Sequence, residues 1–209
     1  ILGIQRSEGE RYFNSLTEFS ALGIGPVYDK FHLVPFGEYT PWGDLMTRFG
    51  IRAFAAQHGF GYSPGASAQV LRFEGLPPVQ PLICYEAVFS RHLITGAERP
   101  VWLLQVTNDA WFGNLSGPWQ HLAQARLRAI ESGLPLMRAA NTGVSAVIDA
   151  RGELRATLGL NLAGRIDAAL PAPLPPTLWS RWGDWPVLVL TCLGLLLAAQ
   201  RRRLTPERD

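Results

Sequence analysis

The sequence is poor in cysteine, and its charges nearly cancel. Only Cys84 and Cys192 occur among the 209 residues, which is too few for a disulfide framework. The 19 basic and 17 acidic residues leave a net charge of +2, and residues 201–209 alone contain four arginines and two acids. Residues 1–200 therefore carry no net charge. This balance argues against a nucleic-acid partner, which would need a basic face.

The composition otherwise indicates a folded domain followed by a membrane segment. With 47% hydrophobic and 17% charged residues, the chain can form a sizeable core. Residues 185–200, WPVLVLTCLGLLLAAQ, carry no charge, are entered through closely spaced tryptophans and precede RRR. We therefore expect a transmembrane helix at 185–201 and a cytoplasmic tail at 202–209, with the globular part on the other side. The alternative is a buried core helix, because a span needs roughly 20 apolar residues.

Strands and helices are expected to alternate through residues 1–167, and a proline-rich linker is expected at 168–184. Short apolar or alternating runs predict strands, and apolar residues at helical spacing predict helices. Strands are expected at 1–5, 12–16, 69–73, 79–84, 101–107, 136–140 and 144–149, and helices at 44–58, 87–95 and 118–132. Glycine and proline in residues 23–43 predict a loop. The pattern indicates an α/β fold in which helices cover a sheet.

Cys84 ends the apolar run PLIC and is followed within a few residues by a predicted helix. A sulfur at such an elbow lies close to a helix N-terminus, which favours the thiolate, and the backbone N–H of Tyr85 is placed to stabilise an oxyanion. Cys192 lies in the expected span, so no disulfide with Cys84 is expected. The arrangement is typical of a nucleophile. The alternative is a buried cysteine that packs as a small apolar residue.

Lys30 is the single lysine in the sequence, since every other basic residue is arginine. A lysine retained in such a chain indicates a position where a guanidinium would not serve, because it is larger and does not lose its proton. Glu38 follows eight residues later, across a loop with proline and glycine, and is placed to hold the ammonium. The alternative is a solvated loop with an ordinary surface pair.

Several motifs together resemble the C-terminal part of the apolipoprotein N-acyltransferase family, a membrane-bound branch of the nitrilase superfamily. These motifs are YDKFHLVPFGEYTP, PLICYE, VTNDAWFG and the long stretch from GPWQHLAQARLRAIESG through NTGVSAVIDARGEL. They occur in the family's order over nearly the whole chain. The resemblance implies a nitrilase-like αββα sandwich, truncated at its N-terminus, with a Glu-Lys-Cys catalytic set.

The resemblance also assigns roles to individual residues. It makes Cys84 the nucleophile and Lys30 the catalytic lysine, with Glu38, Tyr85 and Glu86 in supporting positions. The general-base glutamate of the family lies upstream of the position that matches residue 1, so we expect the chain to be inactive by itself. Two early acids, Glu8 and Glu10, match a surface turn and receive no role. No cofactor and no metal are expected, since His32 and His121 lack the partners of a metal site.

The activity implied by the resemblance is acyl transfer in lipoprotein maturation. An acyl chain would pass from a phospholipid to a cysteine thioester, and then to the N-terminal α-amine of a diacylglyceryl-modified apolipoprotein. A monomer in the bacterial inner membrane, with its catalytic domain on the periplasmic side, is expected. Residues 41–60 would form a lid or a membrane-dipping arm, and the alternative is an ordinary packed helix. Trp111 and Phe112 would line the route of the acyl chain, and the alternative is a role in the scaffold. The alternatives are a nitrilase-type amidase that hydrolyses a small C–N bond, and an inert fragment.

Overall fold

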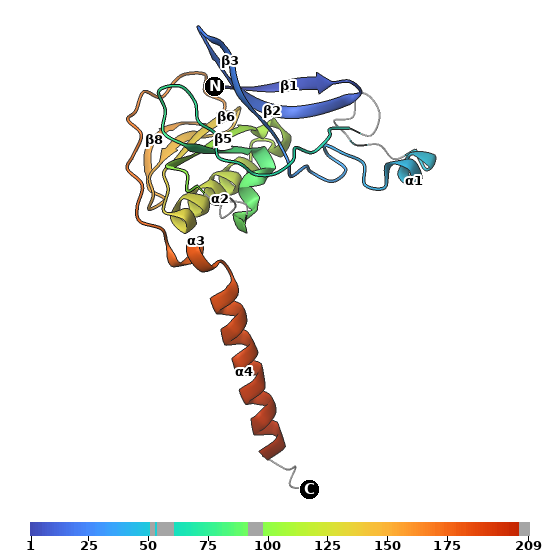
Figure 1. Ribbon diagram of the computed structural model, residues 1–209, viewed down its shortest axis with the longest axis vertical. Coiled ribbons are helices and arrows are strands. Elements are labelled where there is room, and N and C mark those ends of the chain that lie inside the picture. Colours follow the sequence, from blue (N-terminus) through green and yellow to red (C-terminus); the bar gives the residue numbers. More distant parts are fainter. Residues whose placement is uncertain (51–52, 54–60, 92–97, 205–209) are drawn as a thin grey trace.

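The computed structural model of the chain describes residues 1–50, 53, 61–91 and 98–204. Two β-sheets pack face to face, and the helix α2 (Gly117–Ser132) covers the far side of the larger sheet (Figure 1). These described residues supply three layers of the expected αββα sandwich. The outer face of the smaller sheet carries exposed apolar side chains, among them Leu2 at 57% and Phe19 at 50% exposure.

The smaller sheet is an antiparallel meander at the N-terminus. It contains β1 (Leu2–Glu8), β2 (Arg11–Ser20) and β3 (Gly23–Asp29), in that order. The first two strands confirm the strands predicted at 1–5 and 12–16, and each extends further than predicted. The predicted loop at 23–43 is wrong in its first part, where β3 forms despite Pro26. A proline is tolerated there because β3 lies at the edge of the sheet.

The larger sheet has five strands in sequence order. Its strands are β4 (Val79–Ile83), β5 (Trp102–Asn108), β6 (Leu136–Asn141), β7 (Ser145–Ile148) and β8 (Leu154–Leu158). The first three are parallel and the last two antiparallel. The strand predicted at 69–73 is wrong, because this segment contributes one isolated bridge, between Leu71 and Val79. Parallel strands place their carboxyl ends at one edge of a sheet, which is where ligands bind in open α/β folds.

The principal helix of the globular part is α2 (Gly117–Ser132), which crosses from β5 to β6. It ends at Gly133, whose φ of 66° is left-handed, so the predicted stop is confirmed. Two short 3₁₀ helices follow the ends of strands, η1 (Cys84–Val88) after β4 and η3 (Asp109–Phe112) after β5. The continuous helix expected at 87–95 is wrong in its described part, because η1 ends at Val88 and Phe89 has extended backbone geometry; residues 92–95 lie outside the described residues. The helix expected at 44–58 is α1 (Gly43–Arg48), and most of its remainder also lies outside them.

The period-2 alternation of the central strands divides the core in two. Val79 and Ile83 of β4 point toward the smaller sheet, where they pack with Leu16 and Tyr28. The intervening Leu82 points the other way and packs with the residues that α2 buries. Cys84 follows directly on β4, at the end of the strand where these two apolar layers meet.

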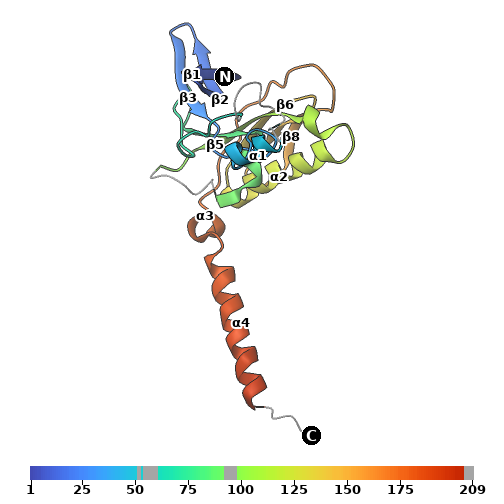
Figure 2. The same cartoon turned by 90° about the vertical axis from the view of Figure 1, so that its right-hand side faces the viewer.

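The C-terminal part leaves the globular body. The linker is tied to the end of α2 by Leu174 N–H, which donates to Gly133 O at 2.9 Å, and by Thr177, whose hydroxyl donates to Glu131 O. After the short α3 (Leu178–Trp182), α4 (Trp185–Leu204) extends away from the sheets (Figures 1 and 2). The predicted span at 185–201 falls on α4. Among the helices in the described ranges, however, none combines the length and apolarity required to cross a membrane.

Candidate active site

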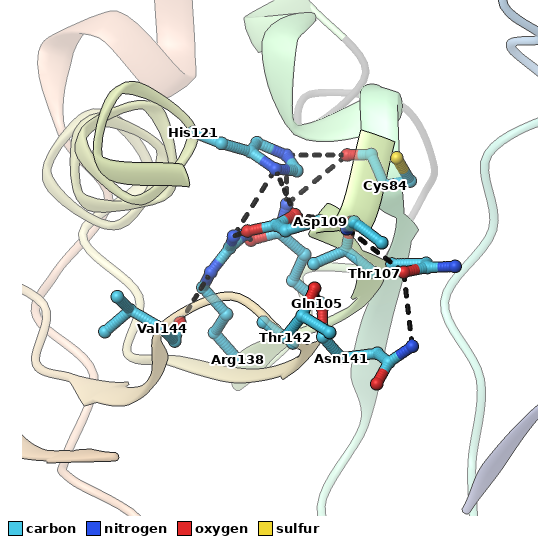
Figure 3. Close-up of polar contacts among 12 residues, drawn as sticks. Cys84, Gln105, Thr107, Asp109, His121, Arg138, Asn141, Thr142 and Val144 are labelled. Carbon is cyan, nitrogen blue, oxygen red and sulfur yellow. Dashed lines mark hydrogen bonds and ion pairs between the residues drawn. The ribbon is translucent and has the colours of Figure 1, made fainter. Parts of the chain in front are cut away.

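Cys84 occupies a sharp turn between β4 and η1, as the sequence predicts (Figure 3). Its φ is +51°, a left-handed value that is uncommon for residues other than glycine. The strand stops here because the next residues turn into a 3₁₀ helix, and the N–H of Ile83 donates to Glu86 Oε2 at 2.8 Å instead of continuing the sheet. The carboxyl ends of β5 and β6 lie beside this turn, since the three strands are parallel.

Lys30 follows β3 directly, and its side chain is completely buried. Its Nζ donates to Glu38 Oε2 at 2.6 Å, and the Glu38 side chain is 12% exposed. Glu38 is held in turn by the N–H of Val34 at 2.8 Å and the Asn14 side-chain amide at 3.1 Å. The solvated-loop alternative for Lys30 is therefore wrong. An ammonium enclosed in this way keeps a fixed position, which a catalytic charge requires.

Glu86 joins the segment of Lys30 to the elbow of Cys84. Besides Ile83 on the elbow side, its carboxylate accepts hydrogen bonds from Phe31 N–H at 2.9 Å and from the Tyr28 hydroxyl at 2.9 Å. The last donor is the N–H of His32, at 3.3 Å. Because these donors come from both sides, one buried carboxylate fixes the lysine segment against the cysteine turn.

Burial dominates the electrostatics around Glu86. It raises the pKa of Glu86, although the hydrogen bonds of Ile83 and Tyr28 and the charge of Lys30 act in the opposite direction. Burial, together with the charge of Glu86, also raises the pKa of Tyr28, so this hydroxyl keeps its proton. For His32, burial and the charge of Lys30 lower the pKa, which favours the neutral ring.

An aromatic group closes one side of the elbow. The ring of His32 stacks on Phe89 with centroids 3.6 Å apart, and Tyr85 meets Phe89 edge-on at 5.0 Å. Edge-on contacts of this kind are favourable beyond the area that they bury. Tyr85 thus lies in this aromatic group, next to Phe89 and His32.

The comparison with known protein families agrees with this geometry. Residues 1–174 match the family described as carbon-nitrogen hydrolase. The chain belongs to the carbon-nitrogen hydrolase family. The fold agrees, because a CN-hydrolase superfamily protein from Xanthomonas campestris superposes with a TM-score of 0.55 over 77% of this chain and 58% of its own, at 21% identity.

Curated relatives of this chain are much more similar in sequence. The apolipoprotein N-acyltransferase of Bradyrhizobium diazoefficiens is 52% identical over 92% of this chain, and that of Rhodopseudomonas palustris is 50% identical over 92%. The resemblance found from the motifs is therefore confirmed. The chain spans 36% of the length of each of these two relatives.

The structure places the predicted site residues in one region. Lys30 and Glu38 are ion-paired, Glu86 binds the segment next to Lys30, and Cys84 and Tyr85 form the elbow beside it. Glu8 is the last residue of β1 and Glu10 lies in the turn to β2, and both are exposed. Asn14 and Tyr28 were not predicted as site residues. Asn14 lies outside the motifs, and Tyr28, although it begins the motif YDKFHLVPFGEYTP, reaches Glu86 only through the fold.

A buried polar cluster beneath the elbow was also missed. It consists of Gln105, Asp109, His121 and Arg138, which come from β5, η3, α2 and β6 (Figure 3). The signals available in the sequence were a glutamine inside the apolar strand WLLQV and a histidine on the apolar face of a helix. Within the described ranges, no three or more His, Cys, Asp or Glu residues are arranged to hold a metal ion.

Proposed function

We propose that the chain carries the catalytic site of an apolipoprotein N-acyltransferase, with Cys84 as the nucleophile. The observation that carries the proposal is the 52% identity to a relative of that name over 92% of this chain. The enclosed Lys30–Glu38 pair and the left-handed Cys84 support it, since both are costly arrangements typical of reaction sites.

The proposed reaction proceeds through a thioester. A general base takes the proton of the Cys84 thiol, and the sulfur attacks the ester carbonyl of a phospholipid acyl chain. Lys30 Nζ and the N–H of Tyr85 stabilise the oxyanion. The C–O bond then breaks, and the lysophospholipid leaves as an alcohol with the proton that the base returns. The resemblance assigns this base to a glutamate that precedes residue 1 in the family.

The second half of the reaction releases the acyl chain. The α-amine of a diacylglyceryl-cysteine at the N-terminus of an apolipoprotein attacks the thioester carbonyl. The C–S bond breaks, an amide forms, and the proton lost by the amine returns to the Cys84 sulfur. Two substrates that react in turn through one covalent intermediate imply ping-pong kinetics.

Exposed apolar residues near the elbow support a lipid substrate. Phe112 lies 5.3 Å from the ring of His121, which itself lies 3.2 Å from the carbonyl oxygen of Cys84. Around Phe112, the side chains of Trp111, Leu115 and Trp119 are between 52% and 85% exposed. Exposed apolar patches of this kind mark binding surfaces. We propose that they receive the acyl chains.

The segment after Glu38 supplies a second exposed apolar group. Trp42 is 74%, Leu45 50% and Phe49 72% exposed, so these three side chains are not packed in the core. We propose that it contacts lipid beside the site. The remaining organisation is also a proposal, namely a catalytic unit at 1–167, a linker at 168–184 and a monomeric protein at the periplasmic side of the inner membrane.

We propose further that α4 is buried in lipid. Its apolar side chains are exposed around the helix, among them Val187 at 67% and Leu190 at 69%, and a helix that is apolar all round requires an apolar environment. The chain should therefore float with phospholipid vesicles on a density gradient, and a version ending at Gly183 should bind them at least tenfold more weakly. Equal flotation of the two versions would contradict this role of α4.

A chimaera tests the proposed activity. In it, this chain replaces the corresponding region of the Bradyrhizobium diazoefficiens relative, and the protein is reconstituted with phospholipid and a diacylglyceryl-cysteine peptide. Mass spectrometry should detect the N-acylated peptide, and Cys84→Ser should abolish it. If the chimaera hydrolyses acyl donors or small amides but leaves the peptide unmodified, the amidase alternative is favoured. If it does neither, the proposed function is wrong.

A further inference from the structure

The buried cluster beneath Cys84 is arranged around Arg138. The Arg138 side chain is completely buried, and it donates to Asp109 Oδ2 at 2.5 Å and to Gln105 Oε1 at 2.6 Å (Figure 3). Gly143 leaves the space that Asp109 occupies, since a Cβ on this glycine would lie 2.2 Å from Asp109 Oδ2. Burying an ion pair at this depth is costly unless further hydrogen bonds complete it.

The contact with Arg138 fixes which way the Gln105 amide points. Because the guanidinium can only donate, the atom of Gln105 that faces it is the oxygen, and the amide nitrogen must face the opposite side. There Nε2 lies 3.3 Å from the Cys84 carbonyl oxygen and 3.0 Å from His121 Nε2. One hydrogen of the amide group can therefore go to each.

The hydrogen bonds then close into a ring. His121 Nε2 accepts from Gln105, and His121 Nδ1–H donates to Asp109 Oδ1 at 2.9 Å. Asp109 in turn accepts from Arg138, where the ring began. With the His121 proton on Nδ1, each of these hydrogen bonds joins a donor to an acceptor. In this tautomer the two further contacts of His121, from Nε2 to the Cys84 oxygen at 3.2 Å and from Nδ1 to Arg138 Nη2 at 3.3 Å, are not hydrogen bonds, so Gln105 is the side chain that donates to the Cys84 carbonyl. The ring points a single remaining N–H of Gln105 at the Cys84 carbonyl.

This contact controls a peptide plane that matters for the reaction. The Cys84–Tyr85 peptide is trans, so its C=O and its N–H point in opposite directions. Figure 3 shows the Cys84 oxygen directed at His121 and Gln105, with the sulfur on the other side. Because the Cys84 oxygen is held in the core, the N–H of Tyr85 points away from the core. An oxyanion donor is needed on this outer side.

We propose that Gln105 is a positioning residue for the nucleophile elbow. Its amide, oriented by Arg138 and His121, holds the Cys84 carbonyl and thereby maintains the left-handed backbone and the direction of the Tyr85 N–H. Gln105 is completely buried and does not contact substrate, so it acts through Cys84 and Tyr85. The effect on catalysis rests on the proposed function, whereas the effect on the Cys84 backbone does not.

Two variants of Gln105 and one matched control test the proposal. Gln105→Met keeps the approximate size and removes the amide, and Gln105→Glu keeps the acceptor for Arg138 but presents an oxygen to the Cys84 carbonyl. Gln80→Met is the control, because Gln80 is equally buried and lies on the neighbouring strand β4, on the same side of the sheet. Acyl transfer is measured in the chimaera described above.

The backbone at Cys84 is measured in this chain with Cys192→Ser, which leaves Cys84 as its one cysteine. After labelling with [¹³C]cysteine, the Cα and Cβ chemical shifts report whether residue 84 has left-handed or extended geometry. This measurement needs no substrate. It therefore tests the inference even if the chimaera transfers no acyl chains, in which case the proposed function fails separately.

The unsubstituted chain should show left-handed shifts at Cys84, and both Gln105 variants should move them toward extended values, while Gln80→Met should not. Because a misplacement of about 1 Å can cost on the order of 10²-fold in rate, Gln105→Met should lower kcat by that order and leave the KM for phospholipid nearly unchanged.

Three results would overturn the proposal. The first is an extended Cys84 in the unsubstituted chain, which requires no variant to fold. The second is unchanged Cys84 shifts in a folded Gln105 variant. The third is a loss of kcat in Gln80→Met as large as in Gln105→Met, since that would mean any buried glutamine in this sheet has the same effect.

Discussion

At the scale of residues, the site depends on a few polar groups buried at the ends of apolar strands. Lys30 and Glu86 are both almost fully buried, and each has partners that compensate the cost of removing its charge from water. Glu38 neutralises Lys30, while backbone N–H groups and a tyrosine hydroxyl surround Glu86. Such groups keep their geometry because their removal from these partners would leave an unpaired charge in the core.

This enclosure predicts how Lys30 responds to substitution. Lys30→Met removes one oxyanion donor, which typically costs on the order of 10² to 10³ in rate. Lys30→Arg keeps the charge but needs more space and a different hydrogen-bond geometry beside Glu38, so we expect a loss nearly as large. Turnover of N-acylated peptide in the chimaera measures both.

The control for Lys30 is Arg72→Met. Arg72 forms an exposed ion pair with Glu98, and the loss of a surface pair should change turnover little. Near-normal activity of Lys30→Arg would mean that any cation suffices at this position, and the proposed role of the lysine would then be wrong.

The sequence pointed to the two residues that are proposed as catalytic, but it could not reveal the residues that hold them in place. Lys30 was recognisable because it is the single lysine, and Cys84 because an apolar run ends there. Gln105 and Arg138 are 33 positions apart, and β5 and β6 bring them together only by pairing in parallel register. Local patterns carry no information on such pairing, and this explains why the cluster was missed.

At the scale of elements, prediction succeeded where one periodicity was long and undisturbed. The helix α2 begins one residue before its predicted start and ends where predicted, because sixteen residues keep one apolar face. Prediction failed for β3, where Pro26 and two glycines suggested a loop, and for residues 69–73, where an apolar run pairs through a single bridge. In both cases tertiary pairing decided the outcome against local propensity.

The end of α2 leads to a prediction about stability. Gly133 has φ +66°, and a Cβ there would lie 3.0 Å from the carbonyl oxygen of Pro175 in the linker. Gly133→Ala should therefore incur left-handed strain of about 1–2 kcal/mol and also disturb the linker. Chemical denaturation monitored by circular dichroism gives the change in the free energy of unfolding.

Gly9→Ala is the matched control for Gly133→Ala. Gly9 has a similar φ of +60°, but a Cβ there would meet nothing within 4 Å. Its substitution therefore isolates the strain alone. We expect Gly133→Ala to be the more destabilising of the two, and equal destabilisation would show that contact between α2 and the linker contributes nothing.

At the scale of the whole molecule, the chain combines a carbon-nitrogen hydrolase fold with features suited to lipid. The family match ends at residue 174, and α3 and α4 follow it as an extension that leaves the sheets. Exposed apolar groups lie on this extension, around Phe112 and around α1. Their distribution is consistent with a site that takes its substrates from a lipid surface.

The most direct test of this account is to trap the acyl-enzyme. The chimaera is incubated with a phospholipid of defined acyl chains and no peptide acceptor, then acid-quenched and digested with trypsin. Cleavage after Arg72 and Arg91 releases residues 73–91, in which Cys84 is the single cysteine. This peptide should gain the mass of one acyl group, which hydroxylamine removes. The adduct should persist in Cys192→Ser and disappear in Cys84→Ser. An unmodified peptide 73–91 in a preparation that acylates the acceptor, or an acyl group on another residue, would contradict the account.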